Sequence, residues 1–192
     1  MLIRLLYILD RLRHVRTRAD DLARLRRQLI TRSGKRPVTA AERDVAAELR
    51  RLRVEVSAAF GRCQSCTTCA VGHPPPHGHH DGGHCCGGGT ENVYTLDEIA
   101  TLRLAGTRPR QLVPPKGPHV GCIFRSPTGC SLPPEHRPNI CVSHICRTLG
   151  RELAARGDLD EMEALCDRMQ ALFRRFMADR GRRLAEEALK DY

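Results

Sequence analysis

One stretch, residues 39–69, sets the expectation for the whole chain: TAAERDVAAELRRLRVEVSAAFGRCQSCTTC. It opens with Thr39 and Glu42 in the spacing of a capping box, in which a hydroxyl and a carboxylate satisfy free amides at a helix start. Apolar residues then recur in alternating steps of four and three, which is typical of one face of a helix. These apolar residues are Val45, Leu49, Leu52, Val56 and Ala59. The stretch therefore predicts a long amphipathic helix that runs directly into three cysteines.

Two further helical segments flank this one. A similar apolar stripe lies between Leu2 and Thr31, so residues 1–60 are expected to form an antiparallel helical hairpin. The capping spacing recurs at residues 158–161, and the stripe behind it predicts a long C-terminal helix within residues 150–192. Aromatic residues make up only 4% of the chain, so aliphatic side chains must fill the core. We therefore expect a mainly α fold.

The middle segment, residues 61–149, has a different composition. It is dense in Pro and Gly and carries nine of the ten cysteines. In the C-x2-C spacing two sulfurs can turn back onto one cation, which is why this spacing recurs in zinc and iron–sulfur sites. We expect an irregular cysteine-rich module, packed with the helices, in which zinc or iron supplies folding free energy that a small apolar core lacks. The predicted metal ligands are Cys63, Cys66, Cys69, Cys85, Cys86, Cys122, Cys130, Cys141 and Cys146. Iron is expected either as single ions or as an iron–sulfur cluster.

A disulfide framework is the rival interpretation of these cysteines. The apolar run from Leu2 to Leu9 is broken by Arg4 and lacks a small-residue cleavage site, so no secretory signal is expected. Thiols stay reduced in the cytosol, and the adjacent Cys85 and Cys86 fit ordinary disulfide geometry poorly. No apolar stretch approaches the roughly 20 residues needed to span a bilayer. We therefore expect a cytoplasmic metalloprotein without membrane contact.

The last two predicted ligands constrain how an ion could be shared. Pro138 suits the first turn of a helix that Gly150 would end. On a regular helix Cys141 and Cys146, five residues apart, project roughly 140° from each other. Either they serve different ions, or the helix is distorted between them. The tenth cysteine, Cys166, lies on the C-terminal stripe and is expected to be a small apolar core residue.

A histidine-rich stretch, HPPPHGHHDGGH at residues 73–84, offers further ligands. Imidazole suits zinc, copper, nickel and iron. His84 directly precedes Cys85 and is the strongest candidate among the histidines. His73 continues the first cysteines in the spacing C-x2-C-x2-C-x3-H-P, which imitates a bacterial ferredoxin motif. For the other histidines, an insertion that binds metal weakly is the favoured interpretation.

Further motifs follow the opening pair Cys63 and Cys66 in a distinctive order. They are Thr95 to Ile99 (TLDEI), Gly121 to Phe124 (GCIF), Thr128 to Leu132 (TGCSL), Arg137 to Cys141 (RPNIC), and Cys146. With this order, residues 63–149 resemble the CxxCxxCC zinc- or iron-chelating domain family of YkgJ-like proteins. The family has its vicinal cysteines in the opening motif, whereas here Cys85 and Cys86 stand behind the histidine-rich stretch.

The resemblance implies a chelating domain, and most members of the family have no assigned activity. Some larger members resemble flagellin lysine methylases that are thought to carry an iron–sulfur centre, so an iron–sulfur enzyme is the alternative function. The chain shows no Gly-rich dinucleotide loop after a strand and no Ser/His/Asp arrangement. Asp97 and Glu98 are expected only to favour the dipole of a short helix. Metal binding, in a structural or metal-handling role, is the leading function, and enzymatic activity is left open.

The formal net charge is +10, with the excess concentrated in residues 1–60. A basic surface suits nucleic acid or an acidic protein, so an adaptor is the third function considered. The N-terminal helices also offer a face for a protein partner or a second copy of the chain. Nucleic-acid binding is disfavoured because no aromatic residues interleave to stack bases. The Arg-rich face consists of Arg11, Arg18, Arg24, Arg26, Arg27 and Arg32.

Overall fold

The computed structural model of the 192-residue chain describes residues 18–31, 38–67, 90–116, 122–126 and 129–190. Helices make up most of these residues, and the strands within them form one short antiparallel pair. The expected mainly α class is confirmed. Within these ranges, no helix is both long and apolar enough to cross a membrane.

Short elements separate two long helices along the described chain. In chain order the elements are α2 (Arg18–Ile30), α3 (Ala40–Phe60), α4 (Gln64–Thr67), α5 (Thr90–Val93), α6 (Leu96–Leu104), η2 (Pro109–Gln111), β1 (Arg125–Ser126), β2 (Gly129–Cys130), η3 (Pro134–His136), α7 (Asn139–Ser143), α8 (Arg147–Arg156) and α9 (Leu159–Lys190). The long helices are α3 and α9, and both were expected from the sequence.

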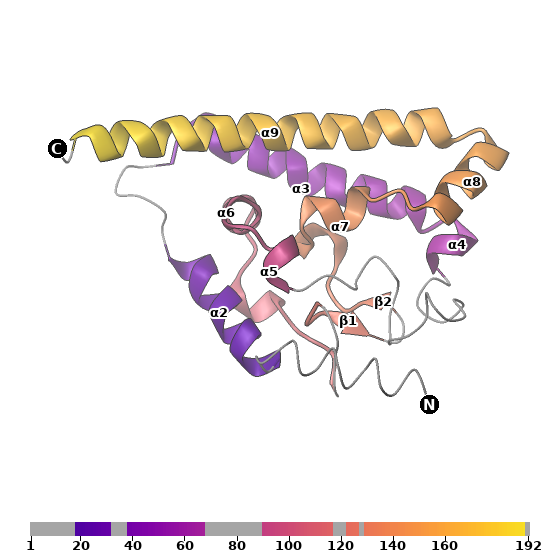
Figure 1. The fold of residues 1–192 in the computed structure, drawn as a ribbon, viewed down its shortest axis with the longest axis horizontal. Coiled ribbons are helices and arrows are strands. Elements are labelled where there is room, and N and C mark those ends of the chain that lie inside the picture. Colours follow the sequence, from indigo (N-terminus) through magenta and orange to yellow (C-terminus); the bar gives the residue numbers. More distant parts are fainter. Residues whose placement is uncertain (1–17, 32–37, 68–89, 117–121, 127–128, 191–192) are drawn as a thin grey trace.

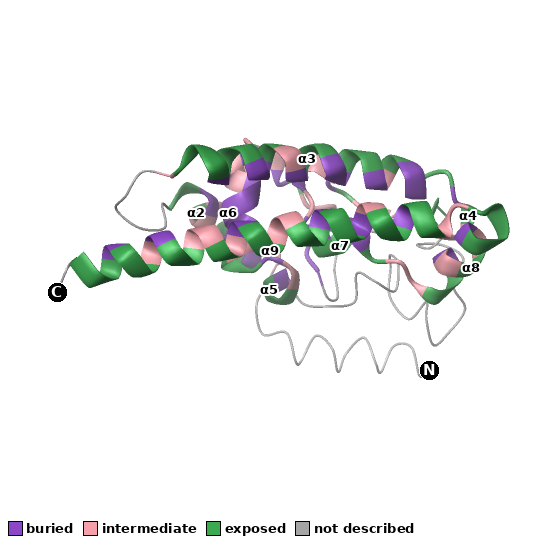
Figure 2. Ribbon diagram, turned by 90° about the horizontal axis from the view of Figure 1, so that it is seen from above, coloured by how far each residue is buried: buried purple, intermediate pink, exposed green. Residues whose placement is uncertain are grey.

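The helices α3 and α9 lie antiparallel along each other and form what we call the frame (Figure 1). The expected apolar stripe of α3 faces this contact, with Val45, Leu49 and Leu52 buried. From α9, Met169 and Phe176 are fully buried in the same cluster. Figure 2 shows buried positions recurring along both helices. Removing this apolar surface from water, at roughly 25 cal/mol per Å², is the main favourable term in the frame.

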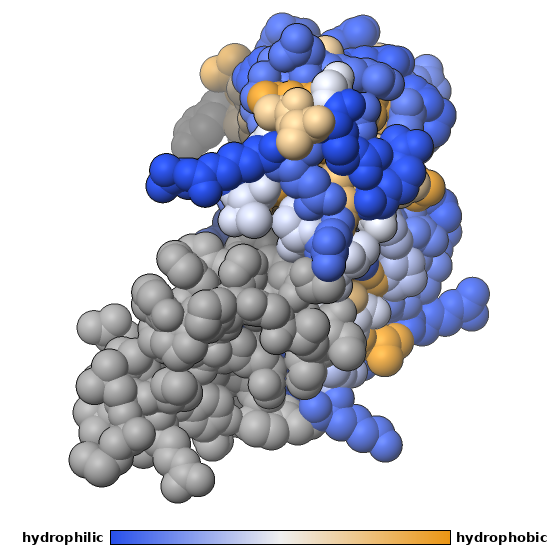
Figure 3. Space-filling view, turned by 90° about the vertical axis from the view of Figure 1, so that its right-hand side faces the viewer, coloured by the Kyte–Doolittle hydropathy of each residue, from blue (hydrophilic) through white to orange (hydrophobic). Residues whose placement is uncertain are grey.

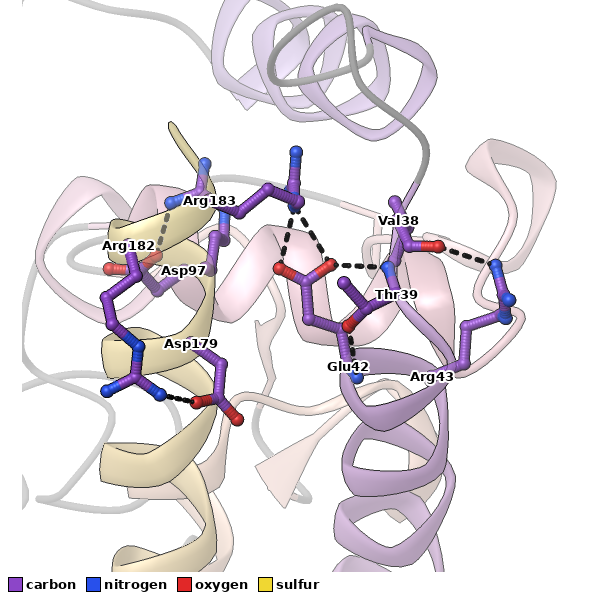
Figure 4. A network of polar contacts seen from close by, with 9 residues as sticks. Val38, Thr39, Glu42, Arg43, Asp97, Asp179, Arg182 and Arg183 are labelled. Atoms are coloured by element: carbon purple, nitrogen blue, oxygen red, sulfur yellow. Dashed lines mark hydrogen bonds and ion pairs between the residues drawn. The ribbon is translucent and has the colours of Figure 1, made fainter. Parts of the chain in front are cut away.

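The start of α3 is fixed by the capping box that the sequence predicts. The Thr39 hydroxyl accepts the Glu42 N–H at 3.1 Å, and the Glu42 carboxylate accepts the Thr39 N–H at 3.2 Å. The same carboxylate accepts a hydrogen bond from Nε of Arg183 on α9 at 2.9 Å (Figure 4). Glu42 is buried. One carboxylate therefore both closes the helix start and ties the two frame helices together.

The first described helix, α2, has a different partner from the one expected. The sequence predicts a hairpin of the first two helices, whereas α2 packs on α6 and η2, and α3 packs chiefly on α9. An apolar stripe specifies which face of a helix is buried but not which helix covers it. The C-terminal helix is 32 residues long and buries Met169 and Phe176 in the same cluster as the α3 stripe, so it covers α3 more completely. Residues 1–17 lie outside the described part of the chain.

Local hydrogen bonds fix both ends of α6. The Thr95 hydroxyl accepts the Glu98 N–H at 3.2 Å at the helix start. At the other end Gly106 adopts φ 92°, a conformation that favours glycine. The Thr107 N–H then bonds the Leu102 carbonyl at 2.9 Å, which completes a Schellman ending.

The single helix expected from Pro138 to Gly150 is instead two helices. α7 ends at Ser143, and α8 runs through Gly150 until Gly157, at φ 76°, ends it. The reason lies at Cys146, which adopts extended backbone angles and caps the new helix. Its sulfur accepts the backbone N–H three residues ahead at 3.5 Å. A new helix, α8, therefore begins after Cys146, where the sequence predicts that the first helix continues.

Two further apolar clusters join the cysteine-rich segment to the helices. The hairpin cluster surrounds the β1–β2 hairpin and contains Leu25, Leu29, Tyr94, Ile99, Leu102, Leu112, Cys122, Ile123, Phe124 and Leu132. The end cluster lies between the end of α3, α8 and the start of α9 and contains Val56, Ala59, Phe60, Cys63, Leu149, Leu153, Met162 and Cys166. Each cluster contains one predicted metal ligand that is buried.

Candidate metal centre

The structure describes six of the nine predicted metal ligands. They are Cys63, Cys66, Cys122, Cys130, Cys141 and Cys146. The remaining candidates lie within residues 68–89, outside the described residues: Cys69, Cys85, Cys86, His73 and His84. Among the described residues there is no disulfide, and no group of three or more His, Cys, Asp or Glu side chains is arranged to hold an ion as it stands. The six described cysteines fall into two groups.

The first group is built on a tight turn at Cys122. The Arg125 N–H donates to the Cys122 carbonyl at 3.1 Å, and Arg125 pairs with Cys130 across the β1–β2 hairpin. Burial raises the pKa of the Cys122 thiol to about 12, while hydrogen bonds from the Phe124 N–H and the Thr90 hydroxyl oppose that rise. Donors directed at a sulfur favour its thiolate, which is the form that binds metal. The turn therefore supplies stabilising donors to a sulfur that is otherwise protonated.

Tyr94 lies beside this group, and sequence reasoning missed it. Its ring packs on Phe124 with centroids 5.6 Å apart, and the residue is only 5% exposed. Burial raises the pKa of its hydroxyl well above the usual range, and the charges of Cys122, Cys141 and Cys130 raise it further. One phenol is thus close to three predicted ligands from the hairpin and α7. Tyr94 belongs to no spacing pattern, so nothing in the sequence distinguishes it.

Glu98 positions α7, the helix that carries Cys141. Its carboxylate accepts the backbone N–H of Asn139 at 3.0 Å and the side-chain amide of the same residue at 3.1 Å. Burial raises the pKa of Glu98 to about 7, against the opposing effects of Arg53 and these hydrogen bonds. The sequence assigns Glu98 only to the dipole of its own helix. That assignment is incomplete, because a buried first-turn carboxylate also anchors the segment packed against it.

Arg53 links this anchor to the frame. Its guanidinium is fully buried and donates to Asn139 Oδ1 and Thr101 Oγ1, each at 2.9 Å, and lies 3.8 Å from Glu98. Burial lowers the pKa of Arg53 to about 10, so it remains a cation at neutral pH. A buried charge persists when it is paired and hydrogen-bonded. One polar network therefore holds α3, α6 and α7 together.

The second group lies where α3 ends. Cys63 is only 1% exposed within the end cluster, and Cys146 packs against the same cluster. Cys66 is exposed on α4, and its N–H bonds the Cys63 carbonyl at 3.2 Å. Burial raises the pKa of the Cys63 thiol, and the Glu152 carboxylate raises it further. On the face that includes this end, Figure 3 shows a mostly hydrophilic described surface with apolar atoms only in small spots.

Glu152 holds this second group in place. Its carboxylate on α8 accepts the N–H of Gln64 at 2.7 Å and the N–H of Ser65 at 2.8 Å. Those amides open the short helix α4, whose free N–H groups need acceptors. Hydrogen bonds from Ser65, through its side chain and its backbone, and then from Gln64 lower the pKa of Glu152 below its usual value. The segment with Cys66 is thus fastened to the helix that Cys146 begins.

The link between α7 and α8 separates the two groups. The sequence left two alternatives for Cys141 and Cys146, namely different ions or a distorted helix. The structure shows the distortion, because residues 144–146 are not helical and the backbone is extended at both His144 and Cys146. Cys141 lies on α7, before the break, and Cys146 packs against the end cluster after it.

The tenth cysteine is a core residue, as expected. Cys166 is buried in the end cluster beside Met162 and Leu153. Burial raises the pKa of its thiol to about 11, so the side chain stays protonated at neutral pH. It behaves as a small apolar residue.

Part of the Arg-rich face of α2 is used inside the molecule. Arg26 donates to the carbonyls of Pro109 and Leu112 at 3.1 and 3.0 Å. Arg24 lies 3.5 Å from Asp21. The Arg26 contacts fasten α2 to the loop around η2, and Arg24 also lies 3.8 Å from Glu91 on α5, so both arginines have a structural role. Arg11 and Arg32 lie outside the described residues.

No protein-family model matches the chain, and no curated protein or solved structure is significantly similar to it. The resemblance to the chelating family therefore rests on the motifs in the sequence alone. The function must be argued from the two cysteine groups and their surroundings.

Proposed function

We propose that this protein binds zinc or iron through cysteine thiolates, and that the metal holds the cysteine-rich segment against the frame. The observation that carries the proposal is the Cys122 turn. There a buried sulfur receives two hydrogen-bond donors, and the charges of Cys122, Cys130 and Cys141 all raise the pKa of the buried Tyr94 hydroxyl. The proposed ligands are Cys63, Cys66, Cys69, Cys85, Cys86, Cys122, Cys130, Cys141 and Cys146.

The chemistry of Cys122 fits a metal better than it fits a reactive thiol. With a pKa of about 12 the thiol is protonated at neutral pH, so it is a poor nucleophile on its own. A divalent cation held by Cys122 would displace that proton, since a coordinating thiol is deprotonated outright. The Phe124 and Thr90 donors would then stand as outer-shell partners of the sulfur. Burial disfavours the free thiolate, and a bound metal would offset that cost.

The number of ligands limits what the first group can bind. A closed structural zinc site uses four ligands, and this group offers three described sulfurs. Because no described group is arranged to hold an ion as it stands, binding requires side chains to turn and a further ligand to join. Cys69, Cys85 and Cys86 are the members of the proposed set that remain for this role.

The proposed role is structural or metal-handling, in the cytosol. A closed thiolate shell suits structure, whereas catalysis requires an open coordination position. The reducing cytosol keeps thiols available for metal. An iron–sulfur cluster would bring the protein closer to the methylase-like members of the chelating family, and its colour distinguishes it from zinc.

Elemental analysis of full-length protein purified without oxygen tests the proposal. We expect at least one zinc or iron per chain, with visible absorption if the metal is in an iron–sulfur cluster. Cys166→Ala is the matched control, because it removes a buried cysteine outside the proposed set and should leave the metal content unchanged. Less than one bound metal per wild-type chain would contradict the proposed function.

A further inference from the structure

We propose that the protein binds the phosphate backbone of double-stranded nucleic acid through one basic surface. The C-terminal ends of α2 and α6, the short helix η2 and one side of α3 form this surface. Its exposed cations are Arg27, Arg50, Arg108 and Arg110. Binding at this surface requires no metal and is therefore independent of the cysteines.

Acidic residues are absent from two stretches of the sequence. The chain holds 22 Asp and Glu among 192 residues, yet none occurs between Asp21 and Glu42 or between Glu98 and Glu135. The first of these stretches holds six Lys and Arg, and the second holds five. A surface built from the two stretches together therefore carries positive charge without a carboxylate of its own.

The structure packs the described parts of these two stretches against each other. The helix α2 contacts both α6 and η2. Arg26 on α2 spans one contact, because its guanidinium donates to the carbonyls of Pro109 and Leu112 at 3.1 and 3.0 Å. Arg103, near the end of α6, donates to the Thr31 carbonyl just after α2. The ends of α2 and α6 therefore lie together with η2.

The long helix α3 adds a cation from the other side of α6. Figure 1 places α6 between α2 and α3, and α6 contacts both. The Arg50 guanidinium on α3 donates to the Ala105 carbonyl at the end of α6 at 2.9 Å. Residues three and four positions away are its neighbours on the helix surface. None of them is acidic, since they are Ala46, Ala47, Arg53 and Val54.

The four exposed cations of the basic surface are not neutralised within the described part of the chain. No ion pair joins any of them to a described carboxylate. In contrast, Arg51 on the opposite side of α3 is paired with both Glu48 and Glu55. Clustered charge of one sign creates a potential of several kT and attracts ligands of the opposite sign. The basic surface can therefore attract a polyanion.

Arginine chemistry and the scarcity of aromatic residues favour a duplex as that polyanion. A guanidinium matches a phosphate with two parallel hydrogen bonds, and all four exposed cations are Arg. Single strands are held in large part by bases stacked on aromatic side chains, whereas this chain has no Trp and is only 4% aromatic. A duplex carries one charge per roughly 1.7 Å of its axis. It can therefore engage cations from several elements at once without any contact to its bases.

Fluorescence anisotropy with full-length protein purified without oxygen tests this proposal. The probes are labelled DNA and RNA duplexes of about 20 base pairs and mixed sequence, titrated at roughly 50 to 200 mM salt. We expect both to bind with dissociation constants on the order of 10⁻⁶ to 10⁻⁴ M. Each neutralised phosphate contributes about −0.9 to the slope of log K against log salt concentration, so four arginines predict a slope of about −3 to −4.

The double variant Arg27→Gln with Arg110→Gln removes two of these cations. We expect it to bind about ten-fold more weakly or worse at low salt, with a slope reduced in magnitude by about 2. The charge-matched control is Arg151→Gln with Arg174→Gln, which changes two exposed arginines on α8 and α9, outside the basic surface. This control should keep the wild-type slope. Arg27→Lys with Arg110→Lys keeps both charges and should also keep most of the slope.

Three results would overturn the proposal. The first is a wild-type protein that binds neither duplex at the lowest salt concentration. The second is an equal loss of affinity in the two Gln double variants, because binding would then come from overall basicity and not from this surface. The third is binding of poly-glutamate in place of the duplexes, which would assign the surface to an acidic protein segment.

Metal content measured on the same samples separates this proposal from the proposed function. Bound metal without duplex binding would leave the proposed function standing and overturn the role of the basic surface. Duplex binding by protein that holds no metal would support the basic surface and contradict the proposed function.

Discussion

The frame and the cysteine-rich segment are built by different means. The frame consists of helices of 21 and 32 residues that bury a continuous apolar face. In the cysteine-rich segment α4, α5 and α7 have four, four and five residues, which is too short for a helix to be stable alone. Polar anchors such as Glu98 and Glu152 take the place of periodic packing there. The chain uses burial where helices are long, and specific contacts where they are short.

Removing the metal should separate the two regions most strongly. Structural zinc contributes apparent binding energies of about 10–16 kcal/mol in zinc-finger peptides, more than any single contact in the frame. After strong chelation, hydrogen exchange should show protection lost across residues 61–149 and retained in α3 and α9. Adding zinc or iron back should restore the protection. Unchanged exchange in residues 61–149 would mean that metal plays no part in holding this segment.

Arg53→Ala should weaken the buried polar contact between the frame and the cysteine-rich segment. The change leaves the Glu98 carboxylate buried without its cation and removes donors to Asn139 and Thr101. Removing one partner of a buried pair costs about 3–5 kcal/mol, which denaturant unfolding measures directly. Arg51→Ala is the matched control, because Arg51 is on the exposed side of the same helix and pairs only at the surface. An equal loss of unfolding free energy in the two variants would show that the buried network does not hold the two regions together.

The pH dependence of stability should depend on the same buried network, through Glu98. Burial raises the pKa of Glu98 from its ordinary value of 4.5 to about 7, so the folded protein binds a proton that the unfolded chain releases. Its contribution is complete below pH 4.5 and is lost as pH rises through 7. Unfolding free energy measured from pH 5 to pH 8 should fall by up to about 3 kcal/mol more in the wild type than in Glu98→Gln.

The comparison with Glu98→Gln isolates this carboxylate from other titrating groups. Burial lowers the pKa of His136, which acts in the opposite sense, but it does so in both proteins. Parallel pH profiles for the wild type and the variant would show that Glu98 does not titrate in this range.

Substitutions at helix caps should give the smallest losses of stability, and the loss should be larger in the frame than at α6. Thr39→Ala removes half of a reciprocal box whose other member, Glu42, also binds Arg183. Thr95→Ala removes a single bond, because the Glu98 carboxylate is engaged with α7. Cap losses cost about 0.5–2 kcal/mol, and we expect thermal unfolding to place Thr39→Ala at the upper end and Thr95→Ala at the lower. The reverse order would mean that the box adds nothing to the frame.

Local patterns predicted the two helices of the frame, because the signals for each helix are local. Thr39, Glu42 and the stripe from Val45 to Val56 lie within a few turns of one another, so periodicity and capping spacing are sufficient to locate α3. The partner of that stripe was not predictable in the same way, because three helices offered similar apolar faces. Tertiary packing, including the buried Arg183, selected α9.

The surroundings of the cysteines were less accessible to sequence reasoning. Spacing identified the cysteines as a set, but the roles of Glu98 and Arg53 depend on contacts between residues 41 to 86 positions apart. Tyr94 packs on Phe124, which is likewise distant in the sequence. The helix expected after Pro138 failed for a related reason. A cysteine at an N-cap is not a usual start signal, so Cys146 gave no indication that a new helix begins there.

The ion pair between Glu42 and Arg183 joins residues 141 positions apart. A ribosome adds about 5–20 residues per second, so Arg183 is made on the order of ten seconds after Glu42. Cys146, the last proposed ligand, is also made before α9 begins at Leu159. Every proposed ligand is therefore synthesised before any residue of α9, the long partner of α3. During synthesis the cysteines are available to metal first, and the frame closes last.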